Sequence, residues 1–275
     1  MRSSRVQSHG DQYRAAMDEL LIDEADGVAT ITLNRPERKN AVTQVMWSEL
    51  RVLFRELGYR DDIRAVILTG AGDAFCSGAD VGGMADRASE RTHALQSMRN
   101  VGDTCQALFD LPKVTIAKVN GVAAGAGLNM ALACDLVVAS DRARFSEIFA
   151  KRGLSVDFGG SFLLPRIVGM QRAKELILLA DIIDAPEAER MGLVNRVVAH
   201  DDLDDFVADW AAKAAAAPPR AVAMSKSLLN RSFSNTLTEA LDAEGVAQAF
   251  NFTTADTKEA VAAFLERRDP TYTGW

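Results

Sequence analysis

Short apolar runs that alternate with helical segments constrain the fold of this chain most. The runs Ala65–Thr69, Val114–Val119 and Leu136–Ala139 are rich in branched apolar residues, and apolar residues recur at helical spacing over Ala41–Leu57. A second, more polar helix is expected over Glu90–Phe109. Continuous apolar runs of this length are typical of strands buried on both faces. Strand, helix and strand in this order predict an α/β fold with a largely parallel sheet.

A β-hairpin is expected before the first helix. The runs Leu20–Glu24 and Val28–Leu33 flank Asp26-Gly27, a dipeptide that supplies the positive φ of a tight hairpin turn. Pro36 follows the second run and ends it, because proline cannot donate a hydrogen bond to a neighbouring strand. Residues 1–15 are mostly polar and show no apolar segment of a secretory signal, so we expect a flexible arm there.

The chain changes character near residue 200, where helical patterns replace strand patterns. We therefore divide it into a flexible arm (1–15), an α/β core (16–200) and a helical C-terminal region (201–275), with Ala217-Pro218-Pro219 as the clearest hinge. The segments expected to be helical are Arg172–Ala180, Pro186–Met191, Leu203–Ala217, Ala221–Asn230, Leu237–Asn251 and Lys258–Arg268.

Charge and composition exclude several classes of function. The net charge of −7 gives no electrostatic reason to expect binding to nucleic acid or to an anionic membrane surface. No apolar run is long enough to span a bilayer. The three cysteines lie far apart, which fits neither a disulfide framework nor a metal-ligand pair and indicates a reducing, cytoplasmic location.

Histidine chemistry is also poorly supported. The chain has three histidines, His9, His93 and His200, and we interpret all three as surface residues. The sequence contains no Gly-x-Ser-x-Gly elbow, no phosphate-binding Walker loop and no His-Glu-x-x-His motif. A serine hydrolase or a zinc enzyme would therefore lack its essential residues, and we expect no metal site.

Two glycine-containing loops are better candidates for chemistry. The first is Phe75–Asp80, and the second is Asn120–Gly127, which precedes an expected helix. Small residues let a ligand approach the backbone, and a helix start leaves N–H groups without partners. One N–H group from each loop could hold a carbonyl oxygen as it gains negative charge. For either loop alone, glycines that only permit tight turns and close packing are the better explanation.

Together and in this order, the two loops resemble those of the crotonase (enoyl-CoA hydratase/isomerase) superfamily. Residues 34–36, 40–41, 133–135, 153–160, 185–198 and 263–268 also fit its pattern. The resemblance implies a ββα spiral core that binds acyl-CoA, a helical C-terminal region that forms trimers or dimers of trimers, and a role in fatty acid metabolism. It implies no cofactor, since coenzyme A is part of the substrate. It also implies that the backbone N–H groups of Ala79 and Ala126 form an oxyanion hole.

The same resemblance implies where coenzyme A would bind. Contacts are expected near Arg38, Lys39 and Ala41, and along Asp80 and Val81 beside the first loop. Phe264 and Arg267 would reach the nucleotide end of the substrate from a neighbouring subunit.

The reaction is harder to assign, because two glutamates of the hydratase branch are absent. Asn129 and Phe149 stand at their positions. An asparagine can bind a water molecule but cannot accept its proton, and phenylalanine can do neither. Glu147 is close in sequence, but a solvated or structural role is the simpler interpretation of that residue.

Asp157 is the strongest candidate for an acid–base group. It matches the aspartate of dienoyl-CoA and related isomerases, although it could instead cap the helix expected to begin near Gly159. The prediction is an enoyl-CoA isomerase in which Asp157 moves a proton between the α- and γ-carbons while Ala79 and Ala126 hold the dienolate. The alternatives are a hydratase with an unusual base, such as Glu147, and a non-catalytic acyl-CoA binder.

Overall fold

The computed structural model of the chain describes residues 19–80, 82 and 91–275. The expected arm over residues 1–15 and the expected contact residue Val81 lie outside this part. The larger of two sheets has the strand order β1-β2-β3-β5-β7-β10. Neighbouring strands are parallel except for the β1–β2 hairpin. Its strands are β1 (Leu20–Ala25), β2 (Val28–Leu33), β3 (Ala65–Gly70), β5 (Val114–Val119), β7 (Leu136–Ser140) and β10 (Arg196–Val198).

A second sheet is built from much shorter strands in the order β4-β6-β8-β9. They are β4 (Ala74–Cys76), β6 (Val122–Ala124), β8 (Arg144–Ser146) and β9 (Ile183–Asp184). Strands of the two sheets alternate along the chain, so that β3 and β4, β5 and β6, and β7 and β8 each form a pair followed by helical structure. This repetition is the expected ββα pattern. These short strands cannot be recognised from the sequence, because runs of two or three residues carry no periodicity.

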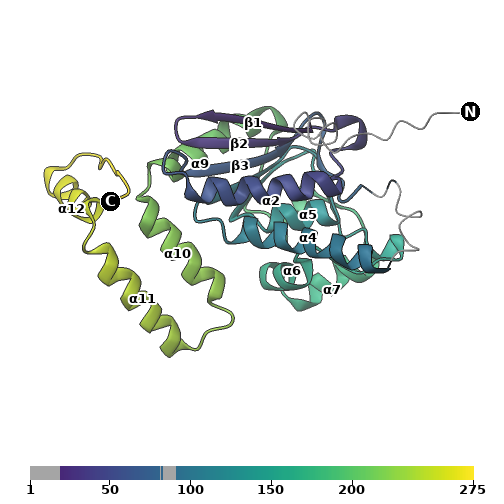
Figure 1. The fold of residues 1–275 in the computed structure, drawn as a ribbon. Coiled ribbons are helices and arrows are strands. Elements are labelled where there is room, and N and C mark those ends of the chain that lie inside the picture. The colour runs from purple at the N-terminus through teal and green to yellow at the C-terminus, as the bar shows by residue number, and fades with distance from the viewer. Residues whose placement is uncertain (1–18, 81, 83–90) are drawn as a thin grey trace, which may run out of the picture.

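Helices surround the sheets and continue into the C-terminal region (Figure 1). Those of the core are α2 (Gln44–Tyr59), α4 (Arg91–Phe109), α5 (Ala126–Leu132), α6 (Gly160–Val168), α7 (Met170–Leu179), α8 (Ala185–Arg190) and α9 (Leu203–Ala216). They are followed by α10 (Pro219–Arg231), α11 (Leu237–Asn251) and α12 (Ala255–Glu266). Short 3-10 turns lie at Pro36–Arg38, Ala150–Arg152 and His200–Asp202.

The expected helices form, with ends that follow local capping. Helix α2 begins at Gln44 rather than Ala41, because the Thr43 hydroxyl accepts a hydrogen bond from the backbone N–H of Met46 and caps it. The stretch Val122–Ala133 divides into β6 and α5 at Gly125, whose φ of 53° turns the chain between them.

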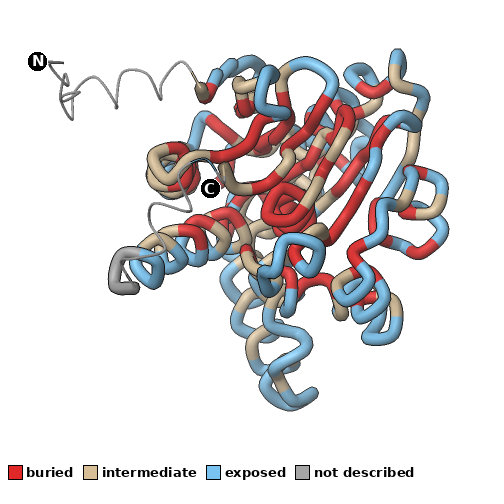
Figure 2. The backbone as a smooth tube through the Cα atoms, turned by 90° about the vertical axis from the view of Figure 1, so that its right-hand side faces the viewer, coloured by how far each residue is buried: buried red, intermediate tan, exposed pale blue. Residues whose placement is uncertain are grey.

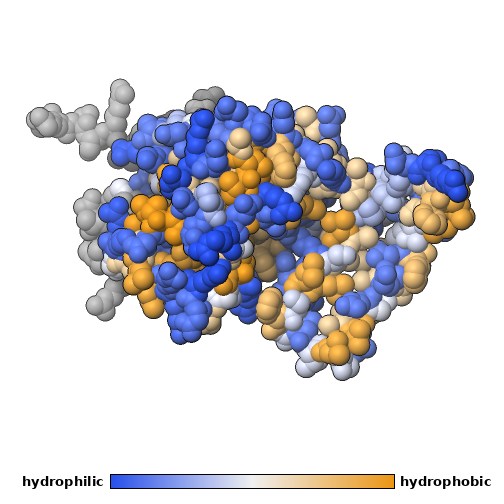
Figure 3. All heavy atoms as spheres, turned by 180° about the vertical axis from the view of Figure 1, so that it is seen from behind, coloured by the Kyte–Doolittle hydropathy of each residue, from blue (hydrophilic) through white to orange (hydrophobic). Residues whose placement is uncertain are grey.

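The main core lies between the large sheet and helices α2, α4 and α5, as the buried backbone in Figure 2 shows. A smaller apolar cluster covers the opposite face, where Leu203, Val207 and Ala211 of α9 pack on Ile67 and Ile116 of the sheet. Helices α10 to α12 form an arm that extends away from this core (Figure 1). Figure 3 shows exposed apolar side chains along the arm, among them Leu229, Phe233, Leu237, Val246, Phe252, Phe264 and Leu265. No described helix is both long and apolar enough to cross a membrane.

Candidate active site

Two loops, one from each of two successive ββ pairs, meet where the short strands β4 and β6 run side by side. A Cβ atom added to Gly78 would lie 3.5 Å from the backbone nitrogen of Ala126, so the two loops are in contact there. Gly127 has less room still, because a Cβ atom would lie 2.8 Å from the carbonyl carbon of Cys76. Glycine is therefore required at position 127 for the close approach of the loops, and at position 78 by a φ of 102°.

The backbone N–H groups of Ala79 and Ala126 are both available for a ligand. Ala126 is the first residue of α5, and the first hydrogen bond of that helix runs from Asn129 to Gly125. Ala79 bridges Val42, but Val42 bonds only the carbonyl of Gly78 and the N–H of Asp80, at 2.9 Å each. No group in the described part of the chain accepts a hydrogen bond from either alanine N–H. Two such amides on adjoining loops are suited to binding one oxyanion.

A cluster of three polar side chains follows the second loop. Asn129 on α5 donates from Nδ2 to Oε2 of Glu147 at 3.4 Å and to the backbone oxygen of Asp157 at 3.0 Å. Asn129 and Glu147 are completely buried. Each of the three side chains keeps one buried oxygen that has no partner in the described structure: Oδ1 of Asn129, Oε1 of Glu147 and Oδ1 of Asp157. Buried acceptors without partners are costly, so this cluster is a candidate ligand site.

Burial shifts the protonation of both carboxyl groups. It raises the pKa of Asp157 to about 6. It raises the pKa of Glu147 to about 8; the hydrogen bond from Asn129 opposes this shift and the charge of Asp157 adds to it. At neutral pH, Asp157 is therefore mostly ionised and Glu147 is mostly protonated. Two carboxyl groups whose pKa values are separated by their surroundings can serve as a base and an acid in one site.

Asp157 does not cap the following helix. The N-cap of α6 is Gly159, and no side chain donates or accepts a capping hydrogen bond there. The next residue, Phe158, fixes the backbone beside Asp157 instead. It has a φ of 45° and is buried against Trp47, with the two ring centroids 5.1 Å apart. The thiol of Cys105 donates to the carbonyl oxygen of Phe158 at 3.4 Å. The Asp157 side chain is thus left free for another role.

The chain matches known proteins over nearly its whole length. The sequence profile described as "Enoyl-CoA hydratase/isomerase" matches residues 23–274. The chain belongs to the enoyl-CoA hydratase/isomerase family. Among curated relatives, a 1,2-epoxyphenylacetyl-CoA isomerase of Escherichia coli is 38% identical over 94% of this chain and 99% of its own length. A short-chain-enoyl-CoA hydratase of Clostridium acetobutylicum is 36% identical over 92% of this chain and 96% of its own.

Solved structures agree with this assignment. An enoyl-CoA hydratase of Mycobacterium smegmatis has a TM-score of 0.87 and 37% identity, covering 92% of this chain and 98% of its own. The expected crotonase fold is therefore confirmed. The similar proteins include both hydratases and an isomerase, so the family assignment does not decide between the two reactions.

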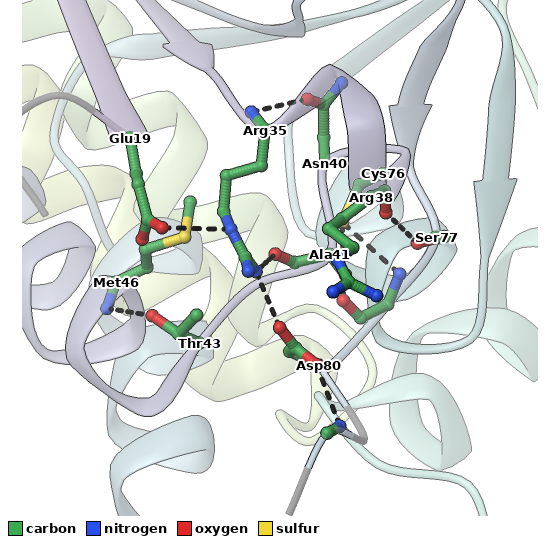
Figure 4. Close-up of polar contacts among 12 residues, drawn as sticks. Glu19, Arg35, Arg38, Asn40, Ala41, Thr43, Met46, Cys76, Ser77 and Asp80 are labelled. Carbon is green, nitrogen blue, oxygen red and sulfur yellow. Dashed lines mark hydrogen bonds and ion pairs between the residues drawn. The ribbon is translucent and has the colours of Figure 1, made fainter.

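The first group of expected coenzyme A contacts lies beside the Ala79 loop. The carbonyl of Arg38 accepts from Ser77 Oγ at 3.1 Å, and that of Lys39 accepts from the N–H of Ser77 at 2.9 Å. Both basic side chains are exposed. Ala41 and Asp80 are joined through the guanidinium of Arg35, as Figure 4 shows. Two exposed cationic side chains beside this loop are suited to binding phosphate groups, such as those of coenzyme A.

The second group of expected contacts lies elsewhere in the protomer. Phe264 is on α12 and Arg267 follows it, both exposed on the arm. Figure 1 shows α12 on the far side of α10 from the core. The structure does not bring these two residues to the site of their own chain.

The structure corrects two interpretations made from the sequence. Glu147 is not a solvated glutamate, because its side chain is completely buried between Ser146 and Ile148 beside Asn129. The apolar residues on both sides of it in the chain, Phe145, Ile148 and Phe149, were the available signal. His200 is half-buried rather than a free surface residue, and its Nδ1 lies within hydrogen-bond distance, 3.0 Å, of Oγ of Ser140.

Proposed function

We propose that this protein is an enoyl-CoA isomerase that converts a 3-enoyl-CoA into a 2-enoyl-CoA. The observation that carries the proposal is Asp157, a half-buried carboxyl with a free, buried Oδ1 atom and a pKa of about 6. Such a group is ionised at neutral pH, yet becomes a usable acid once it has taken a proton. The hydratase glutamate positions hold Asn129 and Phe149, which cannot transfer protons.

The proposed reaction uses one carboxyl twice. The Asp157 carboxylate removes a proton from the α-carbon, and the electron pair of that C–H bond moves into a dienolate with negative charge on the thioester oxygen. The N–H groups of Ala79 and Ala126 hold that oxygen. Asp157 then returns the proton to the γ-carbon, which leaves the double bond between the α- and β-carbons. The amides lower the barrier because they bind the charged intermediate more strongly than the neutral thioester.

A turnover screen with purified protein tests this function. It offers 2-enoyl-, 3-enoyl-, dienoyl- and aryl-CoA esters to the wild-type chain and to Asp157→Asn, which preserves the shape of the side chain but removes the base. We expect 3-enoyl-CoA to be converted, and the substitution to lower kcat by about 10²–10⁴-fold. Unchanged turnover in the variant would exclude Asp157 as the base.

Hydration of a 2-enoyl-CoA is the second candidate, and Glu147 favours it. A protonated Glu147 and an ionised Asp157 could share a water molecule, with Asp157 accepting its proton and Glu147 donating one to the α-carbon. Relatives with hydratase names support this reading. Loss of the enoyl absorbance of crotonyl-CoA measures it directly. Conversion of crotonyl-CoA without any conversion of 3-enoyl-CoA would replace the first candidate by this one.

A protein that binds acyl-CoA without catalysis is distinguished by calorimetry. The binding groups proposed above are Arg38, Lys39, Ala41 and Asp80 for coenzyme A, and the two alanine amides for the thioester oxygen. Tight binding of a saturated acyl-CoA together with no turnover in the whole screen would identify a binder.

Self-association is part of this proposal. Many large apolar side chains are exposed on α10 to α12, and an accumulation of exposed apolar side chains is typical of an interface between proteins. In a trimer or a dimer of trimers, the arm of one subunit would place Phe264 and Arg267 near the coenzyme A of the next. Light scattering coupled to size-exclusion chromatography measures the oligomeric state.

A further inference from the structure

Arg35 joins three segments that are far apart in the sequence. Its side chain is only 13% exposed. The Nε atom lies 3.0 Å from a carboxylate oxygen of Glu19, just before β1, while Nη1 donates to the carbonyl of Ala41 at 2.6 Å and to Oδ2 of Asp80 at 2.8 Å. Figure 4 shows the guanidinium between these partners. A planar group with five N–H donors can satisfy all three at once, which a lysine ammonium cannot do with the same geometry.

Asp80, the last of these partners, is the neighbour of Ala79. Its second oxygen, Oδ1, accepts the backbone N–H of Gly82 at 2.8 Å. Burial alone would raise the pKa of Asp80, but the hydrogen bonds from Gly82 and Arg35 outweigh it and lower that pKa below its ordinary value. The Asp80 carboxylate is therefore charged at neutral pH, and both of its oxygens have partners within the protein.

The segment that Arg35 holds also sets the direction of the Ala79 amide. Val42 bonds the residues on both sides of Ala79, in the pattern of two parallel strands. In that pattern the N–H of the central residue points away from the partner strand. Asn40 fixes the position of this partner segment, since Oδ1 accepts the N–H of Arg35 at 2.9 Å and Nδ2 donates to the carbonyl of Ala74 at 2.7 Å.

We propose that Arg35 is a positioning residue of the oxyanion hole: by holding Asp80 and the Ala41 carbonyl together, it fixes where the Ala79 N–H points. The inference rests on the oxyanion role given to Ala79 under the proposed function. Arg35 is not among the residues proposed to contact the substrate or the reacting atoms. It acts through the short segment Gly78–Asp80, which Val42 holds from one side and the guanidinium holds through the Asp80 side chain.

A misdirected amide has a distinctive effect. It weakens the hydrogen bond to an oxyanion more than the hydrogen bond to a neutral carbonyl, because charge-assisted hydrogen bonds are stronger and more dependent on geometry. Loss of Arg35 should therefore leave the binding of a saturated acyl-CoA nearly unchanged and impair the stabilisation of an enolate. A purely structural arginine would change stability without this separation.

The test uses acetoacetyl-CoA, whose enolate has its own ultraviolet absorbance, as a probe of the oxyanion hole. Wild-type protein is compared with Arg35→Met, Arg35→Lys and Asp80→Asn, and with Arg60→Met as a control. Arg60 also forms two ion pairs with carboxylates, but on the exposed edge of the sheet. Thermal unfolding and butyryl-CoA binding are measured on every variant, so that only folded, ligand-binding protein is compared.

In wild-type protein and Arg60→Met, we expect bound acetoacetyl-CoA to be largely enolised at a pH where the free compound is not. In Arg35→Met and Asp80→Asn, the ratio of enolate to keto form should fall about tenfold or more, since removing an oxyanion donor outright costs about 10²–10³-fold in kcat. Butyryl-CoA affinity should change by less than about threefold in Arg35→Met. It is no criterion for Asp80→Asn, because Asp80 is itself one of the proposed coenzyme A contacts. Arg35→Lys should retain more of the enolate than Arg35→Met. The double variant Arg35→Met with Asp80→Asn should form no less enolate than either single variant, because both substitutions break the same contact.

The outcomes separate this inference from the proposed function. If the wild-type protein does not enolise the probe, the oxyanion role of Ala79 and Ala126 fails, whatever the variants do. If the wild-type protein enolises the probe, and folded Arg35→Met and Asp80→Asn enolise it equally well, the oxyanion role of Ala79 and Ala126 stands. The positioning role of Arg35 is then wrong. Equal losses in enolate formation and in butyryl-CoA binding in Arg35→Met would also overturn it.

Discussion

The side-chain amide of Asn129 donates a hydrogen bond to the backbone oxygen of Asp157 at 3.0 Å. Asn129 lies three residues after Ala126 on α5, so both residues lie on the same side of this short helix. One turn of helix therefore sets the position of the proposed base relative to one of the two proposed oxyanion donors. Gly160 makes this contact possible, because it leaves room for the Asn129 side chain.

Gly160→Ala should disturb this contact. A Cβ atom there would lie 2.6 Å from Cγ of Asn129, which is too close for two carbon atoms. We expect a loss of about 1–3 kcal/mol in the free energy of unfolding, measured with denaturant, together with lower turnover. Gly102→Ala in α4 is the matched control, because its Cβ atom would meet no atom within 4 Å. A Gly160→Ala protein as stable as the control would contradict the crowding argument.

The pH dependence of turnover should report Asp157. The base must be ionised, so kcat/KM for 3-enoyl-CoA should rise with pH up to about 6, the pKa of this carboxyl in the free enzyme, and then level off. A pH profile of the wild-type protein measures this limb. In Asp157→Asn, any residual turnover should no longer follow it. A wild-type profile that is flat between pH 5 and pH 8 (about one unit below to two units above that pKa) would rule out Asp157 as the titrating base.

Glu147→Gln distinguishes the two candidate reactions. Glutamine keeps the size and hydrogen-bonding capacity of the side chain but cannot donate a proton as an acid. If Glu147 takes no part in proton transfer, isomerisation should change by less than about fivefold. Any crotonyl-CoA hydration should fall by about 10²-fold or more, and in the wild type it should decline above about pH 8 as Glu147 ionises. Isomerisation lost to the same extent would place Glu147 in both reactions.

The stability of the protein should decrease as the pH rises from about 4.5 to about 8. Burial raises the pKa of Glu147 from 4.5 to about 8 in the folded state, so within this range the folded chain holds a proton that the unfolded chain releases. The slope from this group is at most about 1.4 kcal/mol per pH unit, in the direction of lower stability at higher pH. Urea unfolding at several pH values measures it. Glu147→Gln should flatten the slope; an identical slope in that variant would assign the effect to other groups.

Replacing apolar residues of helices α10 to α12 should dissociate the proposed oligomer. Phe252 and Phe264 are 68% and 82% exposed, so neither side chain is buried within a single subunit. Phe252→Ser with Phe264→Ser should shift the molar mass in light scattering to that of a single chain while the helical circular dichroism remains. Tyr59→Ser, at an exposed position on α2, is the control. A wild-type protein that is already monomeric would refute this interface.

The sequence by itself determined the architecture and the family. Apolar runs such as Ala65–Thr69 and Val114–Val119 are buried on both faces, so their composition alone marks them as central strands. The two glycine loops could be recognised for a similar local reason, since glycine is needed wherever backbones approach closely. The absence of proton-transferring side chains at Asn129 and Phe149 was equally plain.

Only the tertiary structure decided what the polar side chains do. A glutamate such as Glu147 can be solvated or buried, and its protonation depends on Asn129 and Asp157, which reach it from other elements. Likewise, nothing local to Arg35 indicates that it meets Asp80, 45 residues further along. Burial and hydrogen bonding are properties of the surroundings, and residues distant in the chain supply those surroundings. Local composition therefore predicts strands and turns, but the charge and the role of a buried carboxyl depend on the folded chain.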